Sequence, residues 1–238
     1  MRFSGKLIVV TGGTGGLGRA VSVAFLQEGA RVAVTYRDRA EFDALKTAAA
    51  GSNASALLGE AVDVTDEVAT RRFVDGILAS GGQIDALVNA VGGYAGGIKL
   101  WELDPQTFEK MLALNLRSGY TLARVVIPSM LKQKQGAIVN VSSQAAVSHA
   151  AGASAYAASK AAALAMMDSL AEDVRGTGIR VNTILPSIID TEPNRRAMPK
   201  ADFTKWPKPE EIARVVLFLC SDDARVIHGA AIPVYGQS

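Results

Sequence analysis

Short apolar runs alternate along the chain with longer segments in which apolar residues recur every three or four positions. The short runs are nearly continuously apolar and rich in β-branched residues, which is typical of parallel strands covered on both faces. They predict strands at residues 6–10, 31–35, 56–62, 86–89, 137–141, 179–184 and 230–234. The longer segments predict helices at about residues 16–27, 41–49, 67–79, 105–132, 155–175 and 209–219.

This alternation predicts the fold class. Right-handed crossovers between parallel strands leave few arrangements other than a doubly wound, Rossmann-type α/β fold, with a seven-stranded parallel sheet and helices on both faces. No Ser/Gly-rich linker or block of charge interrupts residues 1–238, so we expect a single domain. Ligands of such sheets bind beyond the carboxyl ends of the strands, so functional residues are expected at that edge.

Composition narrows the classes of partner. The net charge of +2 is spread over interspersed acidic and basic residues, which does not favour nucleic acid. No apolar run is long enough for a membrane span, and the chain opens on a strand rather than a signal peptide. The single cysteine, Cys220, follows an apolar stretch and is expected in the core, which is consistent with a cytoplasmic protein. His228 stands alone in a turn, and no cluster has metal-ligand spacing, so no metal is expected.

A glycine-rich turn joins the first predicted strand to the first helix. Glycines allow unusual backbone angles and close approach of a diphosphate, and the helix N-terminus adds unpaired N–H groups. The alternative is a tight turn without a ligand. The setting favours a dinucleotide-binding turn made by Thr11, Gly12, Thr14, Gly15, Gly16, Leu17 and Gly18.

The end of the second strand bears on the choice of cofactor. An acid there pairs with the ribose hydroxyls of NAD, whereas a basic residue accommodates the phosphate of NADP. Tyr36 stands where the acid is expected, and Arg37 follows it. Asp38 makes the choice between the two cofactors ambiguous, because its carboxylate could pair with Arg37 or Arg39 or approach the ribose. We favour NADP, with NAD as the alternative; the arginines could also be solvated loop charges.

A phenol and an ammonium lie four residues apart at Tyr156 and Lys160. On a helix they share one face, and a lysine cation near a tyrosine favours tyrosinate and lowers the phenol pKa. Ser143 lies just past the fifth strand, where its hydroxyl could donate a hydrogen bond to a substrate oxygen.

In these features the chain resembles the short-chain dehydrogenase/reductase family, in its short, single-domain branch. The resemblance covers essentially the whole length and includes the thirteen-residue gap between Ser143 and Tyr156. The matching residues are Thr11-Gly12…Gly16…Gly18, Asp63, Asn115, Ser143 and Tyr156…Lys160.

The resemblance implies a role for each matched side chain. Tyr156 is the general acid in carbonyl reduction and the general base in alcohol oxidation. Lys160 binds the nicotinamide ribose and lowers the tyrosine pKa, and Ser143 holds the substrate oxygen. Asn115 fixes a water that links Lys160 to solvent, and Asp63 contacts the adenine. The other cofactor-binding residues implied are Val64, Asn89, Ala90, Gly92, Pro186, Ile189 and Thr191.

Two segments depart from the family pattern. The usual Asn-Asn-Ala-Gly after the fourth strand is Asn89-Ala90-Val91-Gly92, which predicts the same backbone turn with altered side-chain bonding. The usual Pro-Gly after the sixth strand is Pro186-Ser187, so Ser187 is expected to carry backbone strain or to change the loop.

The substrate is expected between Tyr156 and an excursion over residues 187–208, which has the composition of a mobile lid. Residues 190–203 also resemble dihydropteridine reductases of the same family, which hints at a planar heterocyclic or quinonoid substrate. A role for His149 in proton transfer is disfavoured because Tyr156 fills that place. The candidate substrate residues are Tyr94, Gln144, His149 and Ile188.

The leading hypothesis is an NAD(P)-dependent oxidoreductase that transfers a hydride between the nicotinamide and a carbonyl or alcohol substrate. The alternatives are a sugar-nucleotide epimerase or dehydratase, a dihydropteridine-reductase-like activity, and a non-catalytic dinucleotide sensor. The family also implies a homo-oligomer, either a tetramer or a dimer. The small residues Ala161, Ala162 and Ala165 would allow close helix approach across a subunit contact or within one subunit.

Overall fold

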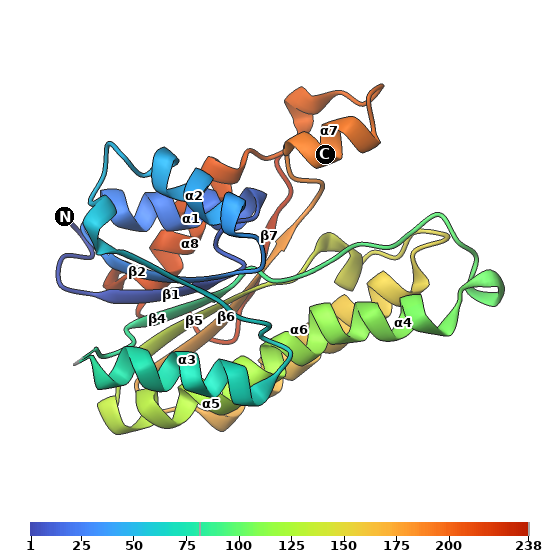
Figure 1. Ribbon diagram of the computed structural model, residues 1–238. Coiled ribbons are helices and arrows are strands. Elements are labelled where there is room, and N and C mark those ends of the chain that lie inside the picture. The colour runs from blue at the N-terminus through green and yellow to red at the C-terminus, as the bar shows by residue number, and fades with distance from the viewer. Residues whose placement is uncertain (81, 238) are drawn as a thin grey trace.

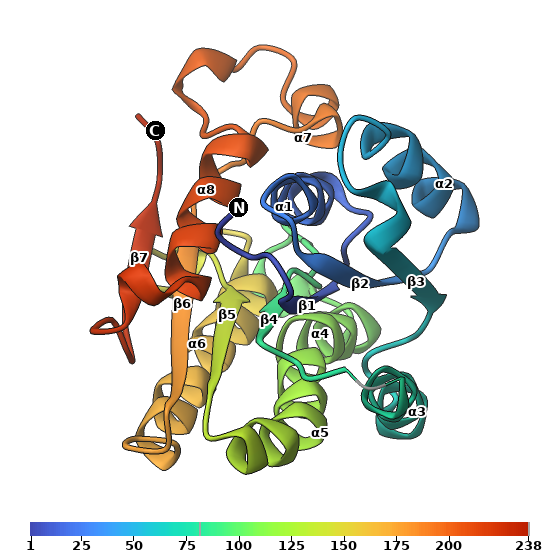
Figure 2. The same ribbon diagram turned by 90° about the vertical axis from the view of Figure 1, so that its left-hand side faces the viewer.

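The computed structural model describes residues 1–80 and 82–237. In these residues one sheet of seven parallel strands has the order β3-β2-β1-β4-β5-β6-β7 (Figures 1 and 2). The strands are β1 (Leu7–Thr11), β2 (Arg31–Tyr36), β3 (Leu57–Ala61), β4 (Ala86–Asn89), β5 (Gly136–Val141), β6 (Ile179–Pro186) and β7 (Ala231–Val234). The order reverses between β1 and β4, and such a switch point opens a ligand crevice at the carboxyl ends of the strands. The predicted fold class is confirmed.

Helices cover both faces of the sheet. α1, α2 and α8 lie on one face, and α3, α4, α5 and α6 lie on the other (Figures 1 and 2). Within the described part of the chain, no helix combines the length and the apolar character needed to cross a bilayer. The helices are α1 (Gly16–Gln27), α2 (Arg39–Ala48), α3 (Glu67–Ala79), α4 (Pro105–Leu112), α5 (Ser118–Gln133), α6 (Ser154–Asp173), α7 (Glu192–Ala197) and α8 (Pro209–Cys220).

The central strand β1 shows why the apolar runs are continuous. Its side chains alternate between the faces of the sheet, and each face has its own core. Ile8 and Val10 pack in the core that includes Phe25 of α1. Leu7 and Val9 pack in the core that includes Phe73 of α3. A strand between two helical layers therefore needs apolar residues at every position.

The structure differs from the pattern at two helices. The single helix predicted at 105–132 is interrupted by a π-helical turn at Ala113–Arg117, which separates α4 from α5. An extra residue in such a turn changes the direction of the following helix, and apolar spacing does not reveal it. The short helix α7 was not predicted, because the prolines and charges of its segment favoured a loop. Other boundaries agree within a few residues.

Candidate active site

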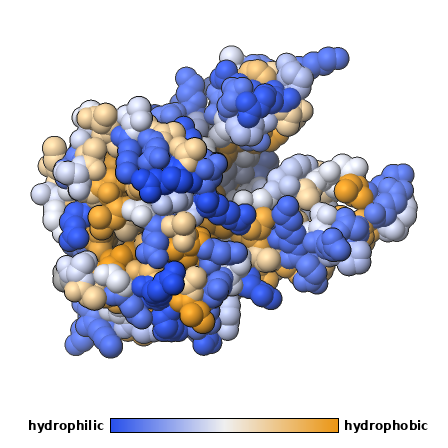
Figure 3. Space-filling model, in the orientation of Figure 1, coloured by the Kyte–Doolittle hydropathy of each residue, from blue (hydrophilic) through white to orange (hydrophobic). Residues whose placement is uncertain are grey.

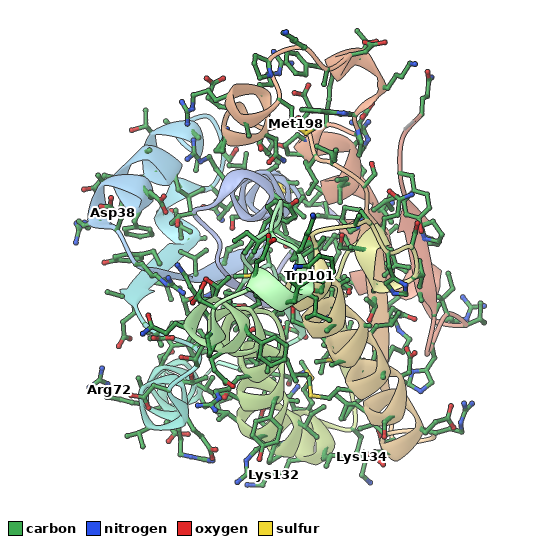
Figure 4. All side chains as sticks on the ribbon, turned by 90° about the vertical axis from the view of Figure 1, so that its right-hand side faces the viewer. Asp38, Arg72, Trp101, Lys132, Lys134 and Met198 are labelled. Atoms are coloured by element: carbon green, nitrogen blue, oxygen red, sulfur yellow. The ribbon has the colours of Figure 1, made fainter. Side chains whose placement is uncertain are left out.

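The carboxyl ends of the strands face one side of the molecule, from which the loop after β4 and the segment containing α7 both project (Figure 1). In the space-filling view the surface is hollowed between these two projections (Figure 3). Figure 4 looks onto this edge, with Trp101 toward the viewer, Met198 on the upper segment and Asp38 beside α2. The candidate residues from distant parts of the sequence meet in this region.

The glycine-rich turn has the geometry of an anion cradle. Gly12 has a φ of +66°, and a Cβ at Gly18 would lie 2.0 Å from the Gly12 carbonyl oxygen, so both positions require glycine. Gly15 is the N-cap of α1, and no side chain caps this end. Gly15 and Gly16 are exposed. The open N–H groups and the positive end of the helix dipole fit a dinucleotide diphosphate.

At the end of β2 the structure distinguishes the three charged side chains by their contacts. The Asp38 carboxylate accepts a hydrogen bond from the Ala40 N–H at 2.8 Å and caps α2. Arg39 forms an ion pair with Asp43 at 3.1 Å. Asp38 is thus committed to the helix, and of the two candidate arginines Arg37 is the one that is exposed without an ion pair within the described residues.

Two further predicted cofactor residues lie close to Arg37. The Tyr36 ring stacks on Phe42, with centroids 4.8 Å apart. Asp63 accepts hydrogen bonds from the Thr65 N–H and hydroxyl. The backbone N–H of Thr65 is the largest cause that lowers the Asp63 pKa, and Arg37 contributes by charge. Arg37 and the Asp63 carboxylate, which follows β3, are therefore close enough to interact by charge.

One further side-chain contact lies at this end of the site. The Thr14 hydroxyl donates a hydrogen bond to the Glu41 carboxylate at 2.8 Å, although the two residues are 27 positions apart. Glu41 is exposed in the first turn of α2. The contact ties the glycine-rich turn to α2, and no sequence signal distinguishes Glu41 from an ordinary solvated helix charge.

The turn after β4 is held by a polar row across the sheet. Asn89 accepts hydrogen bonds from the Thr11 hydroxyl at 3.0 Å and the Val91 N–H at 3.3 Å. Its amide donates to Asn140 at 3.0 Å, and the Ala90 N–H donates to the Thr11 carbonyl. This bonding answers the question left by the unusual Asn-Ala-Val-Gly segment. Asn140 of β5, which no sequence signal singled out, is the acceptor that anchors the Asn89 amide.

Three of the predicted catalytic residues are brought together by β5 and α6. Ser143 follows β5 and is 9% exposed, while Tyr156 and Lys160 lie one turn apart on α6. Burial raises the Tyr156 pKa, a hydrogen bond with Ser143 lowers it, and the charge of Tyr94 raises it further. Burial is the largest cause of the shift, and the lowering of the Tyr156 pKa by Lys160 stays a prediction.

The Lys160 ammonium is buried without a carboxylate partner among the described residues. Its Nζ donates a hydrogen bond to the Val141 carbonyl oxygen at 3.0 Å, and the side chain is 5% exposed. Burial lowers the Lys160 pKa to about 8. Charge held in this way is costly for the fold, so its presence indicates a role beyond stability.

Asn115 lies in the π-helical turn and faces the loop after β4. Its Nδ2 donates to the Gly93 carbonyl at 3.0 Å, and the Gly93 N–H donates back to Oδ1 at 2.9 Å. Nδ2 also donates to the Ser159 hydroxyl on α6 at 2.9 Å. Asn115 thus joins the β4 loop to the catalytic helix, while the water implied by the family resemblance stays a prediction.

The candidate substrate residues come from three loops at this edge. Tyr94, after β4, packs edge-on against Tyr156, with ring centroids 5.0 Å apart and planes at 76°. Gln144 and His149 follow β5, and Ile188 follows β6; His149 and Ile188 are exposed. Their contact with substrate stays a prediction.

The excursion after β6 is braced from within. Asp190 and Arg195 form an ion pair, the Arg195 guanidinium lies 5.0 Å from the Phe203 ring centroid, and Phe203 packs on the buried Trp206. At its base, a Cβ on Gly16 would lie 2.8 Å from Thr191 Cγ2. The predicted cofactor residue Thr191 therefore touches the glycine-rich turn, and movement of the excursion as a lid stays a prediction.

Backbone strain at Ser187 is not observed. Among the non-glycine residues described, Lys134 is the one with a positive φ, so Ser187 avoids the left-handed region. The Ser187 hydroxyl donates to the Tyr235 carbonyl at 2.8 Å. Pro186 ends β6 and is buried, and Ile189 packs against the core. The side-chain hydrogen bond of Ser187 therefore anchors this loop without a left-handed backbone conformation.

Two residues set aside by the sequence analysis have structural roles. Burial raises the pKa of the Cys220 thiol to about 12, as expected for an inert thiol. His228 does not stand alone: its Nδ1 accepts from the Val181 N–H at 3.2 Å, and its Nε2 lies 2.8 Å from the Ala171 carbonyl. The ring joins the segment before β7 to β6 and α6.

Known proteins share both the sequence and the fold. The family model for short chain dehydrogenases matches residues 6–202. The chain is 36% identical to D-threitol dehydrogenase of Mycolicibacterium smegmatis, covering 99% of this chain and 93% of the relative. It is 33% identical to 3-oxoacyl-[acyl-carrier-protein] reductase of Thermotoga maritima, covering 99% and 98%. The solved structure of ElxO with NADP bound superimposes with a TM-score of 0.90 at 26% identity, covering 97% of each chain.

The family match spans most of the sequence, and the relatives align along nearly their whole length. The sheet order and the grouping of Ser143, Tyr156 and Lys160 at the carboxyl edge are in accord with it. The chain belongs to the short-chain dehydrogenase/reductase family.

Proposed function

We propose that Tyr156 exchanges the proton in the reaction of this chain, which is an NAD(P)-dependent oxidoreductase acting on a carbonyl or alcohol substrate. The observation that carries the proposal is the convergence of one phenol, one buried ammonium and one hydroxyl from β5 and α6. When bound, the nicotinamide supplies or accepts the hydride. The remaining chemistry is proton transfer and positioning by the side chains of the chain.

In carbonyl reduction the Tyr156 hydroxyl donates its proton to the substrate oxygen as charge grows on that oxygen. The raised pKa keeps the phenol protonated at neutral pH, ready to act as an acid. Ser143 donates a second hydrogen bond to the same oxygen. Lys160, placed one helical turn from Tyr156, holds the ribose and favours tyrosinate after the proton leaves. In alcohol oxidation the same groups act in reverse.

The cofactor is proposed to be NADP rather than NAD. Asp38 is committed to the α2 cap, and Arg37 is left exposed where a 2′-phosphate would lie. A guanidinium binds a phosphate through paired hydrogen bonds. The relative ElxO was solved with NADP bound, which supports the same choice. The remaining proposed cofactor residues are those of the glycine-rich turn with Tyr36, Asp63, Val64, Asn89, Ala90, Gly92, Pro186, Ile189 and Thr191.

The chain is also proposed to form a homo-oligomer. A largely apolar groove of about 630 Å³ lies among α4, α5 and α6 and includes Leu112, Leu116, Tyr120 and Met166. Tyr120 is 47% exposed, and exposed aromatic side chains of this kind are enriched at interfaces. The groove supports contact between copies through α4, α5 and α6. The proposed compartment is the cytoplasm, which suits an enzyme with a single, inert thiol.

A cofactor-coupled screen tests the activity. Ketones, quinones and pterins are offered with NADPH and with NADH, and loss of nicotinamide absorbance is followed for the wild-type chain and for Tyr156→Phe. Substrate is expected to bind near Tyr94, Gln144, His149, Ile188 and the excursion 187–208. Turnover that falls at least about 10³-fold in Tyr156→Phe, with cofactor binding retained, supports the proposal. Equal turnover in the two proteins removes Tyr156 from the acid/base role.

A further inference from the structure

Ser159 is a fully buried hydroxyl between Tyr156 and Lys160 on α6, and the proposed proton transfer makes no use of it. Its Oγ donates a hydrogen bond to the Tyr156 carbonyl at 2.8 Å and accepts one from Asn115 Nδ2 at 2.9 Å. Because its single proton points to the carbonyl, the Ser159 oxygen can only accept from Asn115. The contact therefore selects which end of the Asn115 amide faces α6.

This selection fixes the other end of the amide. With Nδ2 turned toward Ser159, Oδ1 accepts from the Gly93 N–H, and Nδ2 also reaches the Gly93 carbonyl. The space is tight, since a Cβ on Gly92 would lie 2.9 Å from Asn115 Oδ1 and 3.1 Å from Lys160 Nζ. The loop after β4, residues 91–97, is thus held against Asn115 in one position; we call it the glycine loop.

The residue that follows the seated glycine is Tyr94. Its hydroxyl would lie 2.0 Å from a Cβ on Gly96, so the ring folds back over its own loop. The same ring packs edge-on against Tyr156 while the residue as a whole is 70% exposed. The contacts therefore form a closed ring of groups that starts and ends on α6: Tyr156, Ser159, Asn115, Gly93 and Tyr94.

We propose that Ser159 is a positioning residue: through Asn115 it seats the glycine loop and keeps Tyr94 against Tyr156. The proposal rests on the proposed function of Tyr156 and adds a group that touches neither substrate nor cofactor. Without the Ser159 hydroxyl, no α6 acceptor orients the Asn115 amide, and the loop and the Tyr94 ring loosen together. The pocket wall beside the catalytic phenol then becomes less defined.

The first test needs no substrate. Hydrogen–deuterium exchange of residues 91–97 is measured on the full chain, and we expect at least fivefold faster exchange in Ser159→Ala. Ser118→Ala is the matched control, because this equally buried serine bonds only the Leu114 carbonyl; it should leave the loop unchanged. Ser159→Thr keeps a hydroxyl that can bond the preceding turn and should preserve protection, which covers the case of a poorly folding Ser159→Ala. Equal protection of the loop in Ser159→Ala and the wild type overturns the proposal.

The second test is a double-mutant cycle with a carbonyl substrate from the screen and Tyr94→Ala as the second change. Ser159→Ala should lower kcat/KM for the carbonyl about five- to tenfold and change the dissociation constant of NADPH less than twofold. In the Tyr94→Ala background the same substitution should cost less than twofold. A full loss in that background shows that Ser159 does not act through Tyr94 and contradicts the proposal. Failure of the proposed function is seen separately, as full turnover in Tyr156→Phe with the exchange result unaffected.

Discussion

The two ends of the site are built on opposite principles. At the catalytic end the polar groups are buried: Asn115, Ser143 and Lys160 are each less than a tenth exposed. At the other end, where the adenosine is proposed to bind, Arg37 and Glu41 are exposed to solvent. Buried charges and hydrogen bonds act in a low dielectric, where each loss is large, while exposed charges are screened. The proposed proton chemistry thus lies where substitutions have large effects, and the proposed selection of the cofactor lies where they have small ones.

The largest expected effect that separates the two ends is on turnover. Ser143→Ala should lower kcat about 10²- to 10³-fold, as removal of one donor to a developing oxyanion does. The hydrogen bond with Ser143 also lowers the Tyr156 pKa. Its loss should therefore move the pH profile of alcohol oxidation to higher pH. Steady-state kinetics across pH measure both changes, and a profile that stays in place argues against direct contact between these hydroxyls.

The second effect is on stability. Burial lowers the Lys160 pKa from 10.5 to about 8, so the folded state carries a desolvation penalty of about 3 kcal/mol at neutral pH. Lys160→Met removes it but leaves the Val141 carbonyl without its donor, at a cost of about 1 kcal/mol. A net gain of about 2 kcal/mol at pH 7, with loss of turnover, is expected.

The pH dependence of this gain has a definite sign. Between pH 8 and 10.5 the unfolded lysine holds a proton that the folded one has lost, so wild-type stability rises with pH in this window. The advantage of Lys160→Met should shrink accordingly. Urea unfolding at pH 7 and at pH 10 measures it, and a destabilised variant at pH 7 would show that the ammonium is not strained.

The third effect lies at the adenosine end. Arg37→Ala should reduce the preference for NADPH over NADH by about tenfold, with little change in kcat, because only the 2′-phosphate contact is lost. Raising the salt concentration should mimic the substitution. The dissociation constants of NADPH and NADH for the wild type and for Arg37→Ala test this prediction. Equal affinities in the wild type contradict the proposal of NADP.

The smallest effect is expected at Glu41. Glu41→Gln keeps a hydrogen-bond acceptor for the Thr14 hydroxyl but removes a negative charge near the proposed phosphate site. Exposed charges contribute about 0.2–1 kcal/mol, so NADPH should bind only about two- to threefold more tightly. Weaker binding of NADPH would place the Glu41 carboxylate in contact with the ribose instead.

Several local features were predictable because their cause is local. Continuous apolar runs follow from strands between two helical layers, and a helix places Tyr156 and Lys160 one turn apart. The glycine-rich turn is explained by two positions that cannot hold a side chain. The role of Asp38 was not predictable, since capping α2, pairing with an arginine and binding ribose suit the same carboxylate.

The sequence alone determined the sheet-and-helix alternation, the cradle after β1 and the spacing of the catalytic pair, because each depends on neighbours within one or two turns. Tertiary structure alone decided that Asn115 meets Gly93 and Ser159, that Thr14 meets Glu41, and that burial raises the Tyr156 pKa. Those outcomes depend on how far water is excluded and on which strands become neighbours. Both are properties of the packed molecule, and no single segment encodes them.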